Sequence, residues 1–303
     1  MKIIEDNNRM ILHGVCGFHP DHTFDNGQCF RWNKETDGSY TGVAFGKIVN
    51  IEAADGALIL NNVTKEDYLE IWEDYLDLNR DYEAVKRFLS EHDPKMRKAI
   101  EFGGGMRILK QDPWETVISF IISQNNNIPR IKKCVEGLCA HHGRMIGNYR
   151  GRDYYAFPMP EDLAGLAPED LDSCKLGYRA KYIAETANMV AADGGAALGR
   201  MVSADPEEAY EYLISLSGVG PKVANCIMLF GLRKYASFPL DVWIKRVMHQ
   251  VYGIEENNTG KMQDYAVKHF GELGGIAQQY LFYYAREMSK KDSEGLSGGE
   301  EAC

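Results

Sequence analysis

The segment that most constrains this chain is Leu216–Ala224, with the sequence LSGVGPKVA. Apolar residues recur at helical spacing on both sides of its glycines. Gly218 and Gly220 can adopt backbone conformations that are closed to other residues. Pro221 is favoured at the first position of a helix, because its missing N–H costs nothing there. The segment therefore predicts two helices joined by a tight turn, a helix–hairpin–helix.

The start of the second helix is suited to an anion. Its free amides and its dipole attract a phosphate, and we expect Gly218, Gly220 and Val223 to face a DNA backbone. The same dipole disfavours a protonated amine on Lys222, and a neutral lysine is a usable nucleophile. An ordinary turn with a solvated lysine stays open as an alternative. A nucleotide-binding loop is disfavoured, because Gly220-Pro221-Lys222 lacks the Walker spacing.

Asp241 follows nineteen positions after Lys222 and directly precedes an apolar-periodic run that ends near Val251. This placement predicts a helix N-cap. Capping alone explains an aspartate here. A carboxylate beside a lysine-bearing helix can also stabilise a developing positive charge, so both interpretations stay open.

With Asp241 included, the segment resembles the signature of the helix–hairpin–helix DNA glycosylases that carry a catalytic lysine and aspartate. Further segments are similar to the 8-oxoguanine DNA glycosylases and occur in the order of that family: Phe24–Trp32, Gln111–Glu115, Ser123–Ile128, Leu176–Ala180 and Ala277–Phe282. Together they span nearly the whole chain. The resemblance implies that Lys222 and Asp241 are catalytic and that double-stranded DNA containing 8-oxoguanine is the partner.

Base recognition is expected from two helical faces and one turn. Gln278 and Phe282 are four apart and share a face, as do Lys222 and Cys226. An amide can read the Watson–Crick edge of a flipped base while a ring stacks on it. The resemblance implies these roles, with Cys226 packing on the other side of the base and the Gly27 carbonyl accepting the N7 hydrogen of 8-oxoguanine. Core packing for Phe282 and a plain turn at Gly27 are the alternatives.

The remaining roles come from the resemblance alone. Tyr178 is expected to be the wedge that fills the vacated space, and three residues are expected to contact the estranged cytosine: Asn125, Arg130 and Arg179. Trp243 stands where eukaryotic members have a histidine near the lesion phosphate. The hairpin is also expected to hold a structural cation through the carbonyls of three residues: Ile214, Leu216 and Val219.

These features predict a bifunctional enzyme, a DNA N-glycosylase with lyase activity towards abasic sites. Lys222 would attack C1′ of the sugar, and the resulting Schiff base would permit β-elimination. A monofunctional alkylpurine glycosylase is one alternative, which Lys222 disfavours because such enzymes typically use activated water. A non-enzymatic helix–hairpin–helix binding module is the other. The pairing of Lys222 with Asp241, and of Gln278 with Phe282, argues against it.

The net charge of −10 is unusual for a DNA-binding protein, but the charge is unevenly distributed. Residues 105–150 hold seven basic against three acidic side chains, and residues 215–250 hold five against one. Residues 51–95 hold twelve acidic against five basic. Acidic residues are therefore concentrated away from the motifs, and we expect binding to weaken with salt because phosphate contacts dominate affinity.

Other properties narrow the setting. The seven cysteines are scattered and odd in number, which suits reduced thiols. They lack a tight four-cysteine group near the C-terminus, so we predict no iron–sulfur cluster and no required cofactor. No apolar run of about eighteen residues and no signal peptide is present. We expect a monomer in the cytoplasm, associated with the nucleoid if the source is prokaryotic, and no membrane partner.

The pattern along the chain predicts an α+β fold with a small antiparallel β-sheet N-terminal domain packed on an all-helical core. Alternating runs at Tyr40–Phe45 and Lys47–Ile51 predict strands. Three parts are expected: a sheet domain with flanking helices over 1–100, the helical glycosylase domain over 101–288 and a disordered tail over 289–303. Helices are predicted at 65–76, 82–89, 114–124, 129–141, 160–166, 181–192, 209–217, 222–230 and 275–288.

Overall fold

The computed structural model describes residues 2–54 and 56–297, with side chains described as far as Lys290. Within these residues the N-terminal part forms a six-stranded antiparallel sheet. Its strands, in spatial order, are β1 (Lys2–Glu5), β2 (Arg9–His13), β6 (Ala57–Asn61), β5 (Lys47–Ala54), β4 (Tyr40–Ala44) and β3 (Trp32–Lys34). Phe45 and Gly46 both have positive φ values, 51° and 70°, so the turn from β4 to β5 has the twist that a tight hairpin requires.

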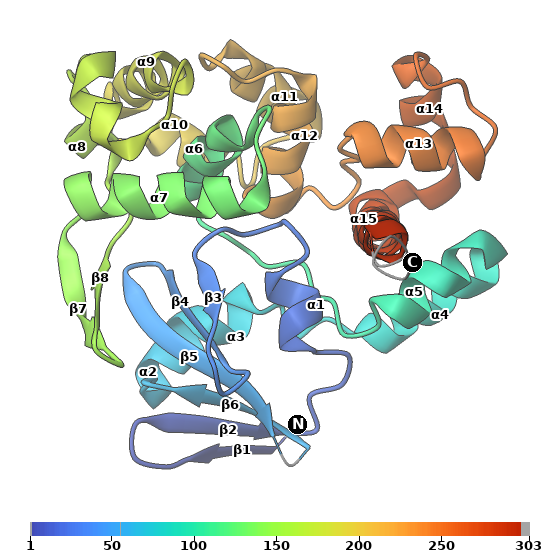
Figure 1. Cartoon of the computed structure of the whole chain (residues 1–303), viewed down its shortest axis with the longest axis horizontal. Coiled ribbons are helices and arrows are strands. Elements are labelled where there is room, and N and C mark those ends of the chain that lie inside the picture. The colour runs from blue at the N-terminus through green and yellow to red at the C-terminus, as the bar shows by residue number, and fades with distance from the viewer. Residues whose placement is uncertain (1, 55, 298–303) are drawn as a thin grey trace, which may run out of the picture.

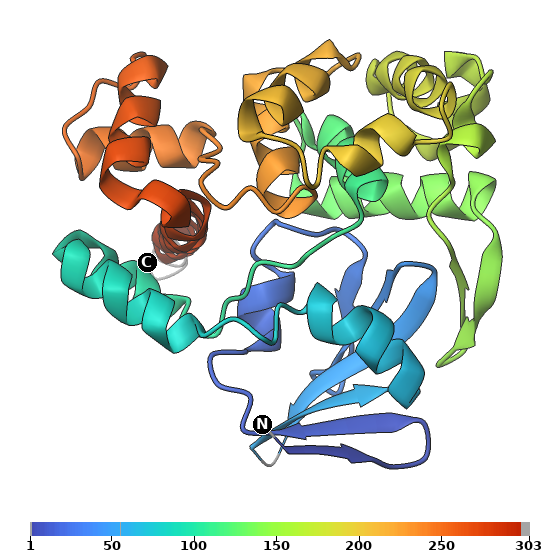
Figure 2. The same ribbon diagram turned by 180° about the vertical axis from the view of Figure 1, so that it is seen from behind.

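Helices make up most of the rest of the chain, and Figure 1 shows the longer ones in two groups, one above the sheet and the other above it and to its right. The first group runs from α6 (Pro113–Ser123) and α7 (Ile128–His142) through α8 (Pro160–Leu163), α9 (Arg179–Ala191), α10 (Ala196–Arg200) and α11 (Pro206–Ser215) to α12 (Pro221–Phe230). The second comprises α13 (Val242–Gln250), α14 (Thr259–Phe270) and α15 (Gly274–Ser297), together with α4 (Tyr82–His92) and α5 (Arg97–Phe102). The view from behind shows the same division (Figure 2).

Short helices complete the fold. They are α1 (Pro20–Phe24), α2 (Lys65–Asp67), a π-helical turn (Tyr68–Trp72), α3 (Glu73–Tyr75), and 3-10 turns at Pro94–Met96, Pro168–Cys174 and Gly271–Leu273. The sheet has its own core, in which Trp32 and Trp72 are fully buried. Leu89 and Met96 pack instead in the core of the helices. The predicted boundary at residue 100 therefore divides residues that share one core, and the boundary itself stays a prediction.

The predicted fold class is confirmed, and the structure differs from the sequence-based expectations in two details. The helical part is mostly helical but not all-helical, because β7 (Met145–Tyr149) and β8 (Arg152–Tyr155) form a hairpin. Arg150 and Gly151 both have positive φ, 51° and 77°, and close it with a two-residue turn. Residues 289–297 are not a disordered tail, since α15 continues through Ser297. The rest of the predicted tail, 298–303, lies outside the described residues.

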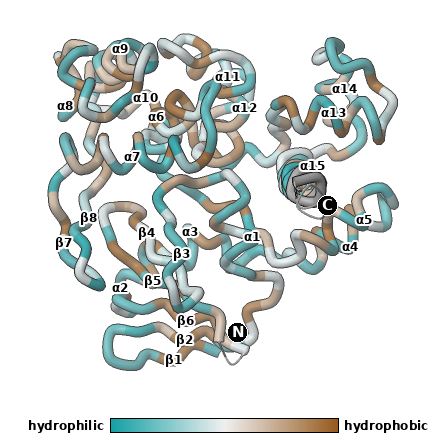
Figure 3. The backbone as a smooth tube through the Cα atoms, in the orientation of Figure 1, coloured by the Kyte–Doolittle hydropathy of each residue, from teal (hydrophilic) through white to brown (hydrophobic). Residues whose placement is uncertain are grey.

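Hydrophobic and hydrophilic residues alternate along the elements, as expected when each element buries one face (Figure 3). Among the described residues, no helix combines the length and hydropathy needed to cross a membrane.

Candidate active site

A cavity of about 940 Å³ opens between the two groups of helices. Its lining comes from the N-terminal segment, α6, α7, α12, α13 and α15. It brings together eight residues predicted or singled out from the sequence: Gly27, Asn125, Gly220, Lys222, Val223, Asp241, Trp243 and Phe282. Its charged lining residues are Lys222, Lys245, Arg286 and Lys290, against Asp241 alone. The cavity is thus locally basic in a chain whose net charge is negative.

Lys222 is placed by the hairpin. Gly220 is the N-cap of α12 and Pro221 its first residue, as predicted, so Lys222 lies in the first turn. Its Nζ lies 5.6 Å from the centroid of the Phe120 ring, within the range of a cation–π contact. The amine is therefore held against an aromatic wall at the positive end of a helix.

The hairpin turn requires glycine at one position. Gly218 has φ +76°, and a Cβ there would lie 2.6 Å from Cγ of Tyr182. The side chains of two neighbours hold the turn through its carbonyls: the Gln124 amide donates to the Gly218 oxygen at 2.8 Å, and the Thr186 hydroxyl donates to the Ser217 oxygen at 2.9 Å. These bonds fix the approach of the chain to α12.

Asp241 caps α13, which confirms the predicted N-cap. Its Oδ1 accepts the Ile244 N–H at 2.8 Å. Burial raises the pKa of the Asp241 carboxyl, while the Ile244 amide and the charge of Lys222 act in the opposite direction. The carboxylate and the amine are thus close enough to interact electrostatically across the cavity.

Cys226 lies one turn after Lys222 on α12 and is buried. Burial raises the pKa of its thiol above the usual range, with Lys222 opposing the shift. The thiol therefore stays protonated and presents an apolar, polarisable group next to the amine.

The other wall of the cavity comes from α15 and from the turn before β3. Phe282 lines the cavity, and Gln278 lies one turn earlier on the same face. Gln278 is 3 % exposed, and its Oε1 has no hydrogen-bond partner among the described residues. Buried amide oxygens are normally satisfied, so this oxygen is an exception, although Gln278 itself is not among the residues that line the cavity.

Gly27 faces this helix. It has φ +87°, and a Cβ there would lie 3.4 Å from Cε1 of Phe282. The turn is attached to α15 by the Gln279 amide, which donates to the Asn26 oxygen at 3.0 Å. Of the four predicted base-recognition residues, Gly27 and Phe282 therefore line the cavity together. Cys226 and Gln278 are buried on the helices that carry Lys222 and Phe282 and are not among the lining residues, so their contact with a base stays a prediction.

The predicted opposite-base residues lie near the starts of two neighbouring helices: Asn125 and Arg130 at α7, and Tyr178 and Arg179 at α9. Asn125 and Arg130 are exposed, and Tyr178 is 54 % exposed. Arg179 is buried: its Nε donates to the Gln124 carbonyl at 2.9 Å and its Nη2 to the Asn125 carbonyl at 3.0 Å. In this structure Arg179 therefore positions the Asn125 loop, and its contact with a cytosine stays a prediction.

Three contributors were missed from the sequence. Gln124 links the Asn125 loop to the hairpin, Phe120 packs against the lysine amine, and Arg286 lines the cavity beside Gly27. Arg286 follows Phe282 by four positions, so the helical spacing that selected Gln278 and Phe282 could also have found it.

The three residues predicted to hold a cation lie at the helix–hairpin–helix turn. The Leu216 carbonyl accepts the Val219 N–H at 3.2 Å. Ile214 lies in the last turn of α11. The carbonyls of Ile214, Leu216 and Val219 therefore all belong to the hairpin. The described residues contain no group of three or more His, Cys, Asp or Glu side chains suited to a metal. Trp243 lines the cavity, with the Arg246 guanidinium 5.2 Å from its ring centroid.

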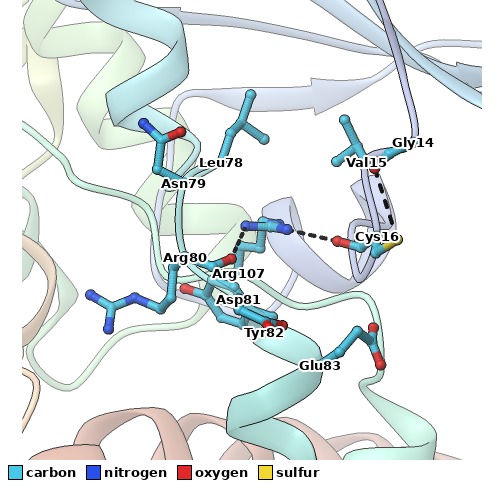
Figure 4. A pocket seen from close by; sticks show the side chains of 10 residues that line it. All are labelled: Gly14, Val15, Cys16, Leu78, Asn79, Arg80, Asp81, Tyr82, Glu83 and Arg107. Atoms are coloured by element: carbon cyan, nitrogen blue, oxygen red, sulfur yellow. Dashed lines mark hydrogen bonds between the residues drawn. The ribbon is translucent and has the colours of Figure 1, made fainter. Parts of the chain in front are cut away.

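A smaller hollow of about 300 Å³ lies elsewhere, between the segments 14–16 and 78–83 (Figure 4). Arg107 crosses it and donates to the Cys16 carbonyl at 2.7 Å and the Asp77 carbonyl at 2.6 Å. Its guanidinium is thus used to join segments of the backbone, which makes this hollow a structural junction.

Comparisons with known proteins show the family of the chain. Residues 118–271 match the model of the HhH-GPD superfamily of base excision DNA repair proteins, and residues 11–117 match the N-terminal domain of 8-oxoguanine DNA glycosylase. A probable N-glycosylase/DNA lyase of Methanothermobacter thermautotrophicus is 35 % identical over 236 residues, covering 71 % of this chain and 74 % of the relative. The N-glycosylase/DNA lyase OGG1 of Arabidopsis thaliana is 30 % identical over 276 residues, covering 86 % and 75 %.

Solved structures give the same result. The Clostridium acetobutylicum 8-oxoguanine glycosylase/lyase, in complex with double-stranded DNA containing cytosine opposite 8-oxoguanine, is 41 % identical with a TM-score of 0.91, covering 95 % of this chain and 99 % of that chain. The hairpin with its lysine and the match over 118–271 define a member of the HhH-GPD superfamily. Within that superfamily the chain belongs to the 8-oxoguanine DNA glycosylase family.

Proposed function

We propose that this protein is a bifunctional base-excision-repair enzyme that removes 8-oxoguanine from duplex DNA and cuts the strand at the resulting abasic site. The observation that carries the proposal is the composition of one cavity. It holds an amine and a carboxylate on one side, Lys222 and Asp241, and Gly27 and Phe282 on the other. A binding module needs neither pair, and a monofunctional glycosylase does not need the lysine.

The reaction follows from the positions of these groups. The damaged nucleotide rotates out of the duplex into the cavity, where Phe282 stacks on the base and the unpaired Oε1 of Gln278 accepts from its Watson–Crick edge. The Lys222 amine attacks C1′ as the base departs. The Asp241 carboxylate stabilises the positive charge that builds on the sugar ring. The Schiff base then undergoes β-elimination, which breaks the strand on the 3′ side.

Opposite-base selection is assigned to the exposed residues at the starts of α7 and α9. Asn125 and Arg130 reach towards the unpaired strand partner, and Tyr178 fills the vacated space in the duplex. The relative of known structure binds DNA with cytosine opposite 8-oxoguanine, which supports a preference for cytosine here. Arg179 joins this set if DNA binding releases part of its guanidinium from the Asn125 loop.

We also propose that catalysis requires no cofactor and no iron–sulfur cluster, and that the protein acts as a monomer in the cytoplasm. A cation held by hairpin carbonyls would add positive charge next to a phosphate. Carbonyl oxygens are suitable ligands for a hard cation. The cation site is tested by measuring DNA affinity as potassium or magnesium is added at constant ionic strength. We expect the affinity to rise and then saturate.

One experiment separates the candidate functions. The protein is incubated with duplexes that contain 8-oxoguanine opposite each of the four bases, with and without borohydride, and products are resolved on denaturing gels. Covalent adducts and strand cuts, most abundant opposite cytosine, are expected. Base release without an adduct would favour a monofunctional glycosylase, and binding without either product would favour a binding module.

A further inference from the structure

Three side chains on α15 repeat at a spacing of four residues: Gln278, Phe282 and Arg286. Such residues share one face of a helix, and this set spans about 12 Å along the axis. The first two belong to the proposed base site. Arg286 extends the same row by one turn and has no role in the reaction derived above.

Arg286 is 7 % exposed and lines the same cavity as Phe282. Its Nε donates to Oε1 of Glu287 at 3.0 Å, and its Nη2 donates to the Asp25 carbonyl. Its Nη1 is buried and has no hydrogen-bond partner among the described residues. An unpaired donor on a buried cation is costly, so an acceptor supplied by a ligand would stabilise it.

The position of this free donor is defined by Gly27. Nη1 lies 3.2 Å from the point that a Cβ on Gly27 would occupy. The guanidinium carbon lies 5.4 Å from the centroid of the Phe282 ring. A donor on Arg286 therefore lies against the backbone of Gly27, next to the Phe282 ring, and the Gly27 carbonyl is the acceptor that the family resemblance implies at this turn.

This pair matches the edge that distinguishes the lesion. Guanine presents an acceptor at N7 and a C–H at C8. Oxidation at C8 converts N7 into an N–H donor and places a carbonyl oxygen, O8, beside it. An acceptor next to a donor on the protein is thus complementary to 8-oxoguanine. For guanine, two acceptors would face each other at N7 and the arginine donor would face a C–H.

We propose that Arg286 donates its Nη1–H to O8 of the flipped base and is a specificity-determining residue. This inference rests on the proposed function. The row on α15 then reads the base from one end to the other, with Gln278 at the Watson–Crick edge, Phe282 on the face and Arg286 at the imidazole edge. A different role is a plain clamp, in which Arg286 only ties the Asp25 turn to α15.

The test compares substrates that differ at one atom. Single-turnover excision is measured for 8-oxoguanine and 8-thioguanine opposite cytosine, together with cleavage at a preformed abasic site. Sulfur is a weak acceptor, so the thio base keeps the N7 hydrogen and loses most of the bond to Arg286. The variants are Arg286→Met, Arg286→Lys and, as a charge-matched control on the exposed face of α4, Arg87→Met.

For Arg286→Met we expect 8-oxoguanine excision to fall by roughly 10- to 100-fold, the range of a charge-assisted hydrogen bond. The preference for oxygen over sulfur should fall with it, while Arg286→Lys recovers part of both. Arg87→Met should stay within about twofold on all three substrates. Because wild type and variant are each measured on both bases, a steric effect of the larger sulfur that is common to both proteins cancels in the comparison.

Two outcomes would overturn the inference. An undiminished preference for oxygen over sulfur in Arg286→Met would exclude the bond to O8. An equal loss on both bases and on the abasic site, with a lowered unfolding midpoint, would identify a clamp. A wild-type protein that cuts neither base but still cleaves the abasic site would instead contradict the proposed function, and the inference would fail with it.

Discussion

The two walls of the cavity are built in different ways. On the catalytic wall, Lys222 and Asp241 come from one segment of 26 residues, 216–241, and each is placed by a helix start. On the recognition wall, the Asp25–Gly27 turn meets α15 from the far end of the chain. The hydrogen bonds that join them connect residues 253 and 261 positions apart.

This difference separates chemistry from selectivity. The amine and the carboxylate depend on local backbone rules, so changes elsewhere should leave them in place. The recognition wall depends on how a turn and a helix dock, so a single added atom can alter it. Variants on the catalytic wall should therefore abolish reaction on every substrate, whereas variants on the recognition wall should change which base is removed.

The largest effect is expected from Lys222→Gln. Removing the nucleophile should lower excision and borohydride trapping by at least roughly 10³-fold, because the covalent step has no substitute. Affinity for lesion DNA should change by less than about threefold. Lys98→Gln, at an exposed position of α5, is the control for loss of one positive charge. Undiminished trapping of Lys222→Gln would assign the Schiff base to another amine.

Asp241→Asn comes next. Asparagine caps a helix about as well as aspartate, so the free energy of unfolding should change by no more than about 0.5 kcal/mol. Excision should fall by about 10²- to 10³-fold, as when one electrostatic stabiliser is removed. A calorimetric scan measures the stability and a single-turnover assay measures the excision rate. A parallel loss of both would show that Asp241 acts only as a helix cap.

The same residue predicts a pH dependence. The ionised carboxylate is the form that acts, and burial raises its pKa above the usual 3.8. The excision rate of the wild type should therefore fall as the pH drops through this raised pKa. The acidic limb should disappear from the profile of Asp241→Asn. Its persistence in the variant would show that a different group titrates.

Gly218→Ala tests the hairpin without touching a reacting group. The positive φ and the 2.6 Å approach to the Tyr182 ring should together cost about 2–3 kcal/mol of unfolding free energy. Gly220→Ala is the matched control, since a Cβ there meets nothing within 4 Å, and it should cost under about 0.5 kcal/mol. Denaturant titrations distinguish them, and equal costs would contradict the packing described for Tyr182.

The smallest effect is expected from Gly27→Ala on the recognition wall. Gly27 and Gly38 have nearly the same φ, +87° and +86°, but only Gly27 has neighbours within 4 Å. Both alanine variants should therefore lose about 1 kcal/mol of stability. Only Gly27→Ala should also lower the ratio of 8-oxoguanine excision to abasic-site cleavage, by about tenfold. The same ratio in both variants would show that Gly27 does not contact the edge of the base that carries the lesion.

Local rules predicted much of this protein. The cap at Asp241, the start of α12 at Pro221 and the strands β4 and β5 follow from N-cap preference, proline geometry and alternation, and the structure confirms each. The β7–β8 hairpin was missed because its turn uses Arg150 and Gly151, and arginine is not a residue that signals positive φ.

The roles of buried polar side chains could not be predicted in the same way. Arg179 was expected to face DNA, yet its donors satisfy carbonyls of the Asn125 loop. Gln124 looked like any polar residue after a helix, and it joins that loop to Gly218. In both cases the partner is a backbone carbonyl that becomes available only when two distant segments pack.

The sequence by itself determined where an amine and a carboxylate would stand at helix starts, because glycine, proline and N-cap preferences act within a few residues. It also determined which residues repeat along one face of α15. Only the tertiary structure decided that this face meets Gly27 and leaves Gln278 Oε1 and Arg286 Nη1 without a hydrogen-bond partner in the described part of the chain. That result depends on docking between the two ends of the chain, and no local preference encodes it.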